Sequence, residues 1–327
     1  MNDHDQLSAG LVQMAPVWLD RDATLDKIAS YISDAADSGC DLVAFGEALA
    51  PGYPFWIELT DGARFNDASQ KRMFSHYLDQ GVVLERGDLA KVTDLCASRS
   101  IAAYVGIMER PADRGGHSLY CTLVYIDKEG NIGSAHRKLQ PTYEERLAWA
   151  PGDGNGLAVH ELGAFRVGGL NCYENWMPLA RSALYAQGES LHVAVWPGNV
   201  RNTSDITRFI AFESRSFVLS ASGVLQADDI PAGTPFRDEL VEVAKTNKYF
   251  ANGGTCAAGP DGQWLLEPVE GDEGLFVVEL DHGQVREERQ QFDLAGHYSR
   301  PDVTQLVVDR TRQSTITFSP PPATALR

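Results

Sequence analysis

The hydrophobic positions of the chain fall into short apolar runs that alternate with segments of helical spacing. Residues 11–14 and 42–45 are compact apolar runs, which predict buried strands. Between them, Asp20 can cap a helix, because apolar residues at helical spacing follow it. That apolar stripe consists of Leu25, Ile28, Ala29, Ile32 and Ala36. Strands and helices that alternate in this way indicate an α/β fold.

The alternation continues toward the carboxyl terminus. Helices are predicted over about 89–98, 179–187 and 204–215. Strands are predicted over 101–108, 119–126, 132–138, 165–170, 191–196 and 217–221. Residues 254–258 and 275–280 predict a late pair of strands with a turn at 260–262 between them. Since short turns join several of these strands, we expect mixed sheets, not purely parallel ones.

No linker rich in proline, glycine or serine divides the 327 residues, which are enough to bury a large core. We therefore expect residues 1–295 to form a single domain. Residues 296–327 are interpreted as a carboxyl-terminal arm that takes part in oligomer contacts. Segments 51–69, 140–155 and 226–235 are expected to be long functional loops.

Composition excludes several classes of protein. The formal net charge of −17 opposes binding to nucleic acid or to anionic membranes. No apolar run approaches the ~20 residues of a membrane span, and the first residues are polar and acidic, unlike a secretory leader. The 5 cysteines are scattered without a CxxC pair, which argues against a disulfide framework and a thiolate zinc site. A cytoplasmic protein is expected.

One cysteine stands in an unusual place. The apolar run 165–170 ends abruptly at Asn171 and Cys172, and polar residues follow. This layout presents a thiol at the carboxyl end of a strand, where open α/β sheets build their sites. Such a cysteine can be a nucleophile if a nearby group makes it a thiolate. The other cysteines fit the ordinary role of a small buried hydrophobe, and they are Cys40, Cys96, Cys121 and Cys256.

The group that activates Cys172 is not evident from spacing alone. No histidine has a context that suggests a catalytic triad, although His160 and His192 stay open as partners. Glu47 follows a buried-looking strand, where partial desolvation would raise its proton affinity as a general base requires. Lys138 ends another strand-like run, and Glu145 lies in the loop after it. A charged residue in such a position is more often a solvated surface residue, and spacing alone does not overturn that interpretation.

The sequences around these residues resemble the signature blocks of the nitrilase family. Glu47 lies in FGE, Lys138 in HRKLQPTYEERLAWAPGDG, and Cys172 in LNCYENWMPLAR. Their order along the chain, Glu then Lys then Cys, matches the family. The segment GHYSRPD at 296–302 also resembles a late block of the family. The resemblance therefore extends over most of the chain.

The resemblance implies a fold, a reaction and a set of site residues. The fold is an α-β-β-α sandwich whose subunits pair into a homodimer or a higher homo-oligomer. The reaction is hydrolysis of a small organic nitrile to a carboxylic acid and ammonia, through a thioimidate and a thioester on Cys172. Glu47 is the implied base, Lys138 stabilises developing negative charge, and Glu145 orients Lys138 or the hydrolytic water. No metal or organic cofactor is implied.

Aromatic residues near the blocks are candidates for the substrate pocket. They are Tyr53, Tyr173 and Trp196, for which ordinary core packing is the alternative. Tyr173 stands where the nitrilase branch usually has tryptophan. Glu174 is interpreted as holding the turn after Cys172 by hydrogen bonds.

Other functions fit part of the same pattern. Amidases of the superfamily use the same Glu-Lys-Cys triad. The segment ENWMPLAR at 174–181 resembles the nitrilase branch, however, so nitriles are favoured over amides as substrates. A cyanide-hydrating enzyme is a further alternative. A non-catalytic assembly subunit is the alternative from another class, and the presence of every triad side chain argues against it.

Assembly is expected from the helix after the active-site block, which packs across a subunit interface in this family. Here the segment is 176–187, and its apolar residues exceed what one face of a lone helix needs. These residues are Trp176, Met177, Leu179, Leu184 and Tyr185. A symmetric homodimer is the expected minimum unit.

Overall fold

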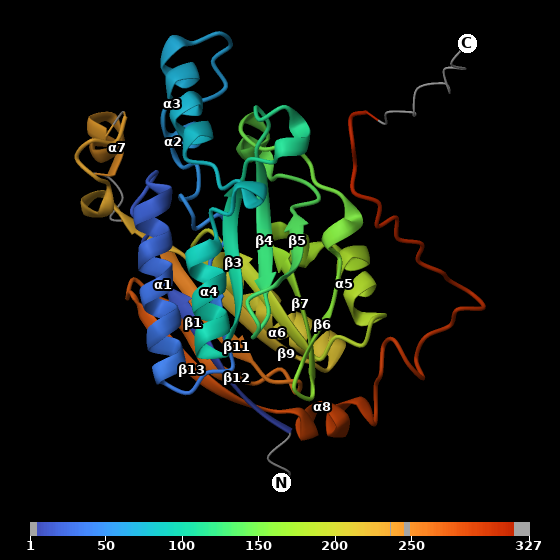
Figure 1. The fold of residues 1–327 in the computed structure, drawn as a ribbon. Helices are drawn as coiled ribbons and strands as arrows, with labels where there is room; N and C mark the ends of the chain where they lie inside the picture. Colours follow the sequence, from blue (N-terminus) through green and yellow to red (C-terminus); the bar gives the residue numbers. More distant parts are fainter. Residues whose placement is uncertain (1–4, 236, 245–248, 317–327) are drawn as a thin grey trace, which may run out of the picture.

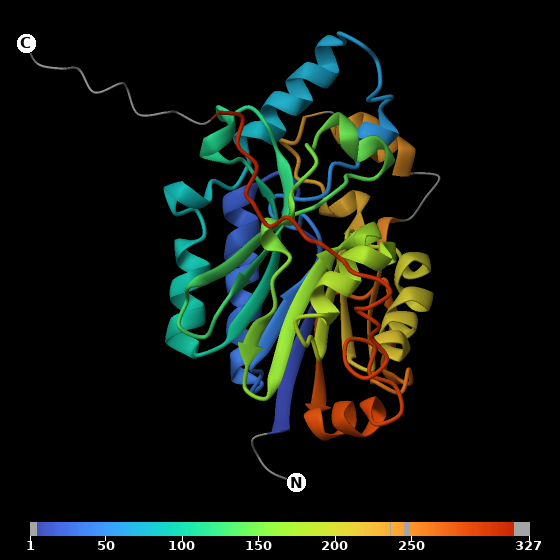
Figure 2. The ribbon, with the colours of Figure 1, turned by 90° about the vertical axis from the view of Figure 1, so that its right-hand side faces the viewer.

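The computed structural model describes residues 5–235, 237–244 and 249–316. Two mixed β-sheets pack face to face, and helices cover their outer faces (Figure 1). Figure 2 shows the layers from the side, with α1 and α4 over one sheet and α6 over the other. The predicted fold class, an α-β-β-α sandwich with mixed sheets, is confirmed.

The first sheet has the strand order β13-β1-β2-β3-β4-β5. Its strands are β1 (Gln6–Gln13), β2 (Leu42–Phe45), β3 (Ala102–Glu109), β4 (Tyr120–Ile126), β5 (Ile132–Arg137) and β13 (Gly274–Asp281). β1, β2 and β3 are parallel, and β4 is antiparallel to both β3 and β5. The carboxyl ends of β2 and β5 therefore lie at the same edge of the sheet.

The second sheet has the order β10-β11-β9-β8-β7-β6, with β12 paired to β11. Its strands are β6 (His160–Leu162), β7 (Phe165–Asn171), β8 (Leu191–Trp196), β9 (Phe217–Ser222), β10 (Val224–Gln226), β11 (Tyr249–Ala258) and β12 (Trp264–Glu270). β7, β8 and β9 are parallel. This half of the molecule thus repeats the parallel centre of the first sheet.

The helices complete the outer layers. They are α1 (Arg21–Asp37), α2 (Trp56–Leu59), α3 (Ala68–Asp79), α4 (Ala90–Arg99), α5 (Pro178–Tyr185), α6 (Val200–Ser214), α7 (Arg237–Ala244) and α8 (His282–Arg289). Asp20 caps α1, because its side chain accepts a hydrogen bond of 3.0 Å from the Ala23 N–H. Short 3₁₀ helices include η4 (Tyr143–Leu147), η5 (Gly154–Gly156) and η6 (Cys172–Trp176). No helix of the described chain is long and apolar enough to cross a bilayer.

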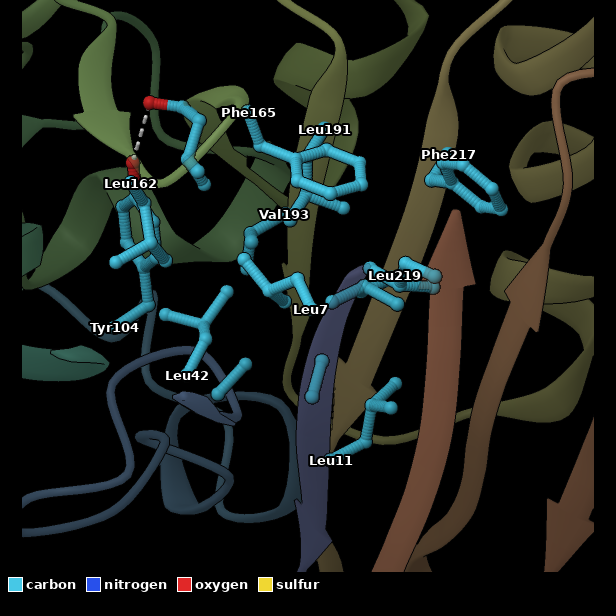
Figure 3. Close-up of a cluster of buried hydrophobic side chains, with 14 of the residues drawn as sticks. Leu7, Leu11, Leu42, Tyr104, Leu162, Phe165, Leu191, Val193, Phe217 and Leu219 are labelled. Atoms are coloured by element: carbon cyan, nitrogen blue, oxygen red, sulfur yellow. Dashed lines mark hydrogen bonds between the residues drawn. The ribbon is translucent and has the colours of Figure 1, made fainter. Parts of the chain in front are cut away.

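The main core lies between the two sheets (Figure 3). β1 shows how alternation builds it: Leu7 and Leu11 point into this core, and Val12 points toward the helices. The Tyr104 hydroxyl donates to the Val167 carbonyl at 3.2 Å, which links the two sheets directly. Each fully buried large apolar side chain contributes roughly 1.5–3 kcal/mol to such a core.

The prediction for the last strands is wrong in its pairing. The turn at 260–262 leads from β11 into β12, and these two strands are the antiparallel pair. β13 instead crosses to the first sheet and pairs with β1. The sequence does not indicate β12, because Glu267 and Pro268 interrupt its apolar pattern. Both residues are tolerated on this strand because it lies at the edge of its sheet.

The segment 51–69, expected to be a loop, contains α2 and leads into α3. α3 buries only Met73, Tyr77 and Leu78, so its apolar stripe is too narrow to stand out in the sequence. Beyond α8, residues 290–316 contain no helix or strand and extend outward on the side of the molecule where α5 lies (Figure 1). Arg312 of this segment pairs with Asp153 at 3.0 Å and so fastens it to its own subunit.

The backbone of β3 at Gly106 lies close to the backbone at Gly46 and Glu47. A Cβ at Gly106 would lie 2.1 Å from the Gly46 carbonyl oxygen and 2.9 Å from the Glu47 Cα. We expect Gly106→Ala to lower the free energy of unfolding by about 1–3 kcal/mol, because backbone must move to relieve the overlap. Urea denaturation measures this loss. Gly233→Ala is the control, since a Cβ there meets nothing within 4 Å, and equal stability of both variants would contradict the prediction.

Candidate active site

Three strand ends bring the predicted triad residues together between the sheets. Glu47 follows β2, Lys138 follows β5, and Cys172 follows β7 of the second sheet. All three side chains are buried, with exposed fractions of 2%, 1% and 3%. Their surface-charge interpretation is therefore wrong for Glu47 and Lys138. Burial of charged groups at this depth requires compensating partners.

The partners are the members of the cluster themselves. The Lys138 Nζ lies 2.8 Å from Glu47 Oε1 and 2.7 Å from Glu145 Oε2. The Cys172 sulfur and one carboxylate oxygen from each of Glu47 and Glu145 all lie within 4.8 Å of one another. One ammonium group thus stands between two carboxylates, with a thiol beside them.

Glu145 is held rigidly in this position. Its Oε2 accepts the Thr142 N–H at 2.6 Å, which forms the capping box of η4. Its Oε1 accepts the Tyr53 hydroxyl at 2.8 Å. Because both oxygens also serve fixed donors, Glu145 can orient the Lys138 ammonium without turning away from it.

Glu47 is less completely bonded. Its Oε1 accepts from Lys138 and from the Cys121 thiol at 3.4 Å, while its Oε2 has no hydrogen-bond partner among the described residues. Burial raises the pKa of Glu47 to about 7, with the Lys138 charge lowering it and the Glu145 charge raising it. Glu47 therefore holds a proton-accepting oxygen near neutral pH, as a general base requires.

Lys138 keeps its charge in spite of its burial. Burial alone lowers the pKa of an amine, but Cys172, Glu47 and Glu145 together hold the pKa of Lys138 well above its ordinary value. Its nitrogen is a fixed positive charge at neutral pH. It can stabilise negative charge that develops on a reacting group nearby.

Cys172 adopts a strained backbone conformation at the start of η6. Its φ is 46°, in the left-handed region that residues other than glycine rarely occupy. Burial raises the pKa of its thiol well above the ordinary value, and the two carboxylates raise it further. Lys138 and a hydrogen bond from the Tyr173 N–H lower the pKa of the thiol. The same N–H is available to a developing anion.

The three aromatic candidates have different surroundings. Tyr53 contacts the cluster through Glu145, and Tyr173 exposes 47% of its surface. The Trp196 side chain is fully buried among hydrophobic residues that pack against α6, and its Nε1 donates to Ser220 Oγ at 3.3 Å. The Trp196 carbonyl oxygen accepts the Glu47 N–H at 3.1 Å, so its backbone helps to place the carboxylate.

A cavity of about 290 Å³ lies on the Tyr53 side of the cluster. Its lining includes Tyr53, Phe55, Leu59, Glu144, Asn199 and Phe250. Tyr53 forms the wall between this cavity and Glu145. The cavity is large enough to hold a small organic molecule beside the cluster.

Glu47, Glu145 and Cys172 also form, within the described chain, a group whose donor atoms could hold a metal ion. Both carboxylates already bind the Lys138 ammonium at 2.8 Å or less. A divalent ion would need the position that this ammonium occupies and would meet its charge. These residues therefore fit an ammonium-centred site better than a metal centre.

Two residues near the cluster have roles that the sequence signals only weakly. Cys121 is buried as expected, yet its thiol lies 3.4 Å from Glu47 Oε1. Glu174 holds the turn, as predicted: it accepts the Asn171 N–H at 2.8 Å and the Leu139 N–H at 2.6 Å. It thereby links the neighbours of Cys172 and Lys138.

Comparisons with known proteins agree with this geometry. A family model described as carbon–nitrogen hydrolase matches residues 8–290. The chain is 33% identical over 321 residues to Nitrilase 2 of an unknown prokaryotic organism, with 97% of each chain covered. It is 33% identical to an aliphatic nitrilase of Rhodococcus rhodochrous, over 96% of this chain and 82% of that one.

A solved structure of an amidase from Nesterenkonia sp. superimposes with a TM-score of 0.62 at 20% identity, over 87% of this chain and 94% of that chain. At this identity the likeness concerns the fold. The family match and the identity to the two nitrilases reach further, since both span nearly the whole chain. They confirm the resemblance seen in the sequence: the chain belongs to the carbon–nitrogen hydrolase family.

Proposed function

We propose that this enzyme hydrolyses a small organic nitrile to a carboxylic acid and ammonia, with Cys172 as the nucleophile. The observation that carries the proposal is the buried cluster in which Lys138 bridges Glu47 and Glu145 beside the thiol. The relatives that cover nearly the whole chain are named nitrilases, which supports nitriles over amides as substrates.

The first step forms a covalent bond to the enzyme. Glu47 removes the Cys172 proton as the sulfur attacks the nitrile carbon, and the proton then passes to the nitrile nitrogen to give a thioimidate. We assign Oε2 of Glu47 as the acceptor, since it has no hydrogen-bond partner among the residues that the structure describes. Lys138 and the Tyr173 N–H stabilise the negative charge that develops during the attack.

Two waters complete the reaction. The first water adds to the thioimidate carbon as Glu47 takes one of its protons and passes it to the nitrogen. Glu47 then moves the proton of the new hydroxyl group to the same nitrogen, the carbon–nitrogen bond breaks, ammonia leaves and a thioester remains. The second water attacks the thioester, the carbon–sulfur bond breaks, and a proton returns to the sulfur as the acid departs. Glu145 keeps Lys138 in place throughout, because its own oxygens are held by Tyr53 and Thr142.

The cavity beside Tyr53 is the proposed substrate pocket, because Tyr53 lines it and binds Glu145 of the cluster. Tyr173 is proposed to contribute its backbone N–H, which binds the Cys172 sulfur. We further propose residues 1–295 as the hydrolase domain and 296–327 as an arm that contributes to oligomer contacts. A cytoplasmic location is proposed because the cysteines of the described chain are all free and buried, which is typical of a reducing compartment.

We propose a symmetric homodimer as the minimum unit. Trp176, Met177 and Leu179 supply the apolar surface for it, with exposed fractions of 46%, 37% and 66%. The expectation that Leu184 and Tyr185 add to this surface is wrong. Both are buried within their own subunit, because they lie on the face of α5 that packs on the second sheet.

The nucleophile is tested by Cys172→Ala, which should abolish ammonia release from a nitrile panel while leaving the circular dichroism spectrum unchanged. Cys172→Ser should be nearly as damaging, because a hydroxyl ionises far less readily than a thiol. Cys96→Ala is the control, since Cys96 is an equally buried thiol on α4, away from the cluster. Retention of more than a few per cent of activity by Cys172→Ala would sink the assignment.

The base and the cation are tested together. Glu47→Gln and Lys138→Ala should each lower kcat at least ~10²-fold, as expected for a general base and an electrostatic stabiliser. Since burial raises the pKa of Glu47 to about 7, its carboxylate gains a proton below that pH. The kcat/KM of the wild type should then fall about tenfold per pH unit.

Lys128→Ala is the control for charge removal, because Lys128 pairs with Asp41 at the surface. A kcat of Lys138→Ala equal to that of this control would contradict the role of the buried ammonium. A kcat/KM profile that stays flat for about two units below pH 7 would contradict the role of Glu47.

Assembly is tested by light scattering at micromolar concentration, which should give a mass of at least two chains. Leu179→Asp should shift the mass toward one chain, because a carboxylate in an apolar interface is costly to desolvate. Phe65→Asp is the control at a fully exposed apolar residue between α2 and α3. A wild-type monomer with full activity would refute the proposed dimer.

A further inference from the structure

A second line of buried polar side chains ends at the nucleophile but takes no part in the cluster described above. It runs from Glu189 through His192 to Asn175, and all three residues have no exposed surface. His192 belongs to β8 and Asn175 to η6, so the line joins the second sheet to the turn that carries Cys172.

The hydrogen bonds fix the direction of each side chain. Asn175 Nδ2 donates to the Cys172 carbonyl at 2.9 Å and to the Leu170 carbonyl at 3.3 Å. Its Oδ1 must therefore face His192, whose Nε2 lies 2.7 Å away and has to donate. The Asn175 amide has no alternative orientation, since a flipped amide would set its oxygen against two carbonyl oxygens.

The other ring nitrogen of His192, Nδ1, faces Glu189. His192 Nδ1 lies 2.9 Å from Glu189 Oε1, and both atoms would be acceptors if no proton lay between them. This hydrogen bond therefore needs a proton between the two atoms. Glu189 Oε2 has no hydrogen-bond partner within the described chain.

The surrounding backbone makes room for this line. Gly168 is the residue on β7 directly opposite His192. A Cβ at Gly168 would lie 2.2 Å from Glu189 Oε1, so the carboxyl group fits only because a glycine stands there. The buried carboxyl, the histidine and the glycine thus form one packed unit beneath the nucleophile.

We infer that Asn175, His192 and Glu189 are positioning residues for Cys172, an inference that rests on the proposed role of this thiol as nucleophile. Cys172 has a strained backbone with φ of 46°, and such strain persists only where neighbouring contacts impose it. Asn175 supplies that contact by holding the Cys172 carbonyl. The sulfur consequently stays directed at Glu47, Lys138 and the Tyr173 N–H.

Within the described chain, neither of the two histidines that the sequence left open as partners of Cys172 is hydrogen-bonded to its thiol. His192 acts on the backbone of Cys172 through Asn175, while the thiol itself faces the carboxylates and the lysine. His160 is engaged elsewhere, with Ser134 Oγ at 2.8 Å and its ring stacked on Tyr125.

The test compares four variants by the rate of alkylation of Cys172 with iodoacetamide and by kcat and KM with a nitrile. Asn175→Asp removes both amide hydrogens at constant shape, and His192→Leu removes the ring nitrogens. His192→Gln restores a donor toward Asn175, and His160→Leu is the control at the other histidine. Mass spectrometry of the peptide that contains Cys172 gives the alkylation rate.

We expect Asn175→Asp and His192→Leu to lower both the alkylation rate and kcat by about tenfold or more, with KM changed less than about threefold, because a small misplacement of a reacting group is costly. His192→Gln should recover most of the loss, and His160→Leu should match the wild type. A folded Asn175→Asp with wild-type alkylation and kcat would overturn the inference.

Alkylation does not depend on the substrate, so failure of the proposed nitrile hydrolysis would leave this comparison intact and distinguishable. Should the variants not fold, nitrogen NMR of wild-type protein labelled at histidine decides the matter. The line of hydrogen bonds requires a protonated Nε2 on His192. The NMR signal of this nitrogen is assigned by its absence from the spectrum of His192→Gln. If that variant is also unfolded, the signal is assigned by its coupling across the hydrogen bond to labelled Asn175. An unprotonated Nε2 would overturn the inference as well.

Discussion

The structure depends above all on one buried ion cluster, in which the Lys138 ammonium lies between the Glu47 and Glu145 carboxylates. Taking these charges out of water is costly, and only close mutual contact offsets the cost. Two carboxylates and one ammonium leave an excess negative charge, which a proton on Glu47 can cancel. Burial, which disfavours the charged form, and the neighbouring Glu145 carboxylate raise the pKa of Glu47 to about 7 against the opposing charge of Lys138. Glu47 is thereby a proton acceptor beside the Cys172 thiol.

The packing of the two sheets keeps this cluster away from solvent. Glu47 and Lys138 come from one edge of the first sheet, and Cys172 comes from the corresponding edge of the second. Because the sheets pack face to face, the three side chains meet between them with at most 3% of their surface exposed. Glu145 lies on a short 3₁₀ helix whose capping box fixes its carboxylate next to Lys138. The site is therefore assembled by strand ends, and its precision depends on backbone hydrogen bonds such as that from the Glu47 N–H to Trp196.

Much of this could be predicted from the sequence. The parallel strands are short apolar runs with clear ends, and 42–45 and 191–196 coincide with β2 and β8. Sequence blocks also named the residues of the cluster, although position alone left Glu47 and Lys138 as possible surface charges. The pairing of β13 with β1 was beyond reach, because it joins opposite ends of the chain and no local pattern encodes it. The line from Glu189 to Asn175 was equally hidden, since its spacing reflects packing across β7 and β8.

In the proposed mechanism Cys172 becomes covalently acylated while Glu47 accepts and donates the protons. Acid quenching of the wild-type enzyme during turnover of a nitrile, followed by peptide mass spectrometry, tests it most directly. The account predicts an adduct on the peptide that contains Cys172, with the mass of the thioimidate or the corresponding thioester. Hydrolysis of the nitrile with no adduct on Cys172, or with the adduct on Cys121 instead, would contradict it.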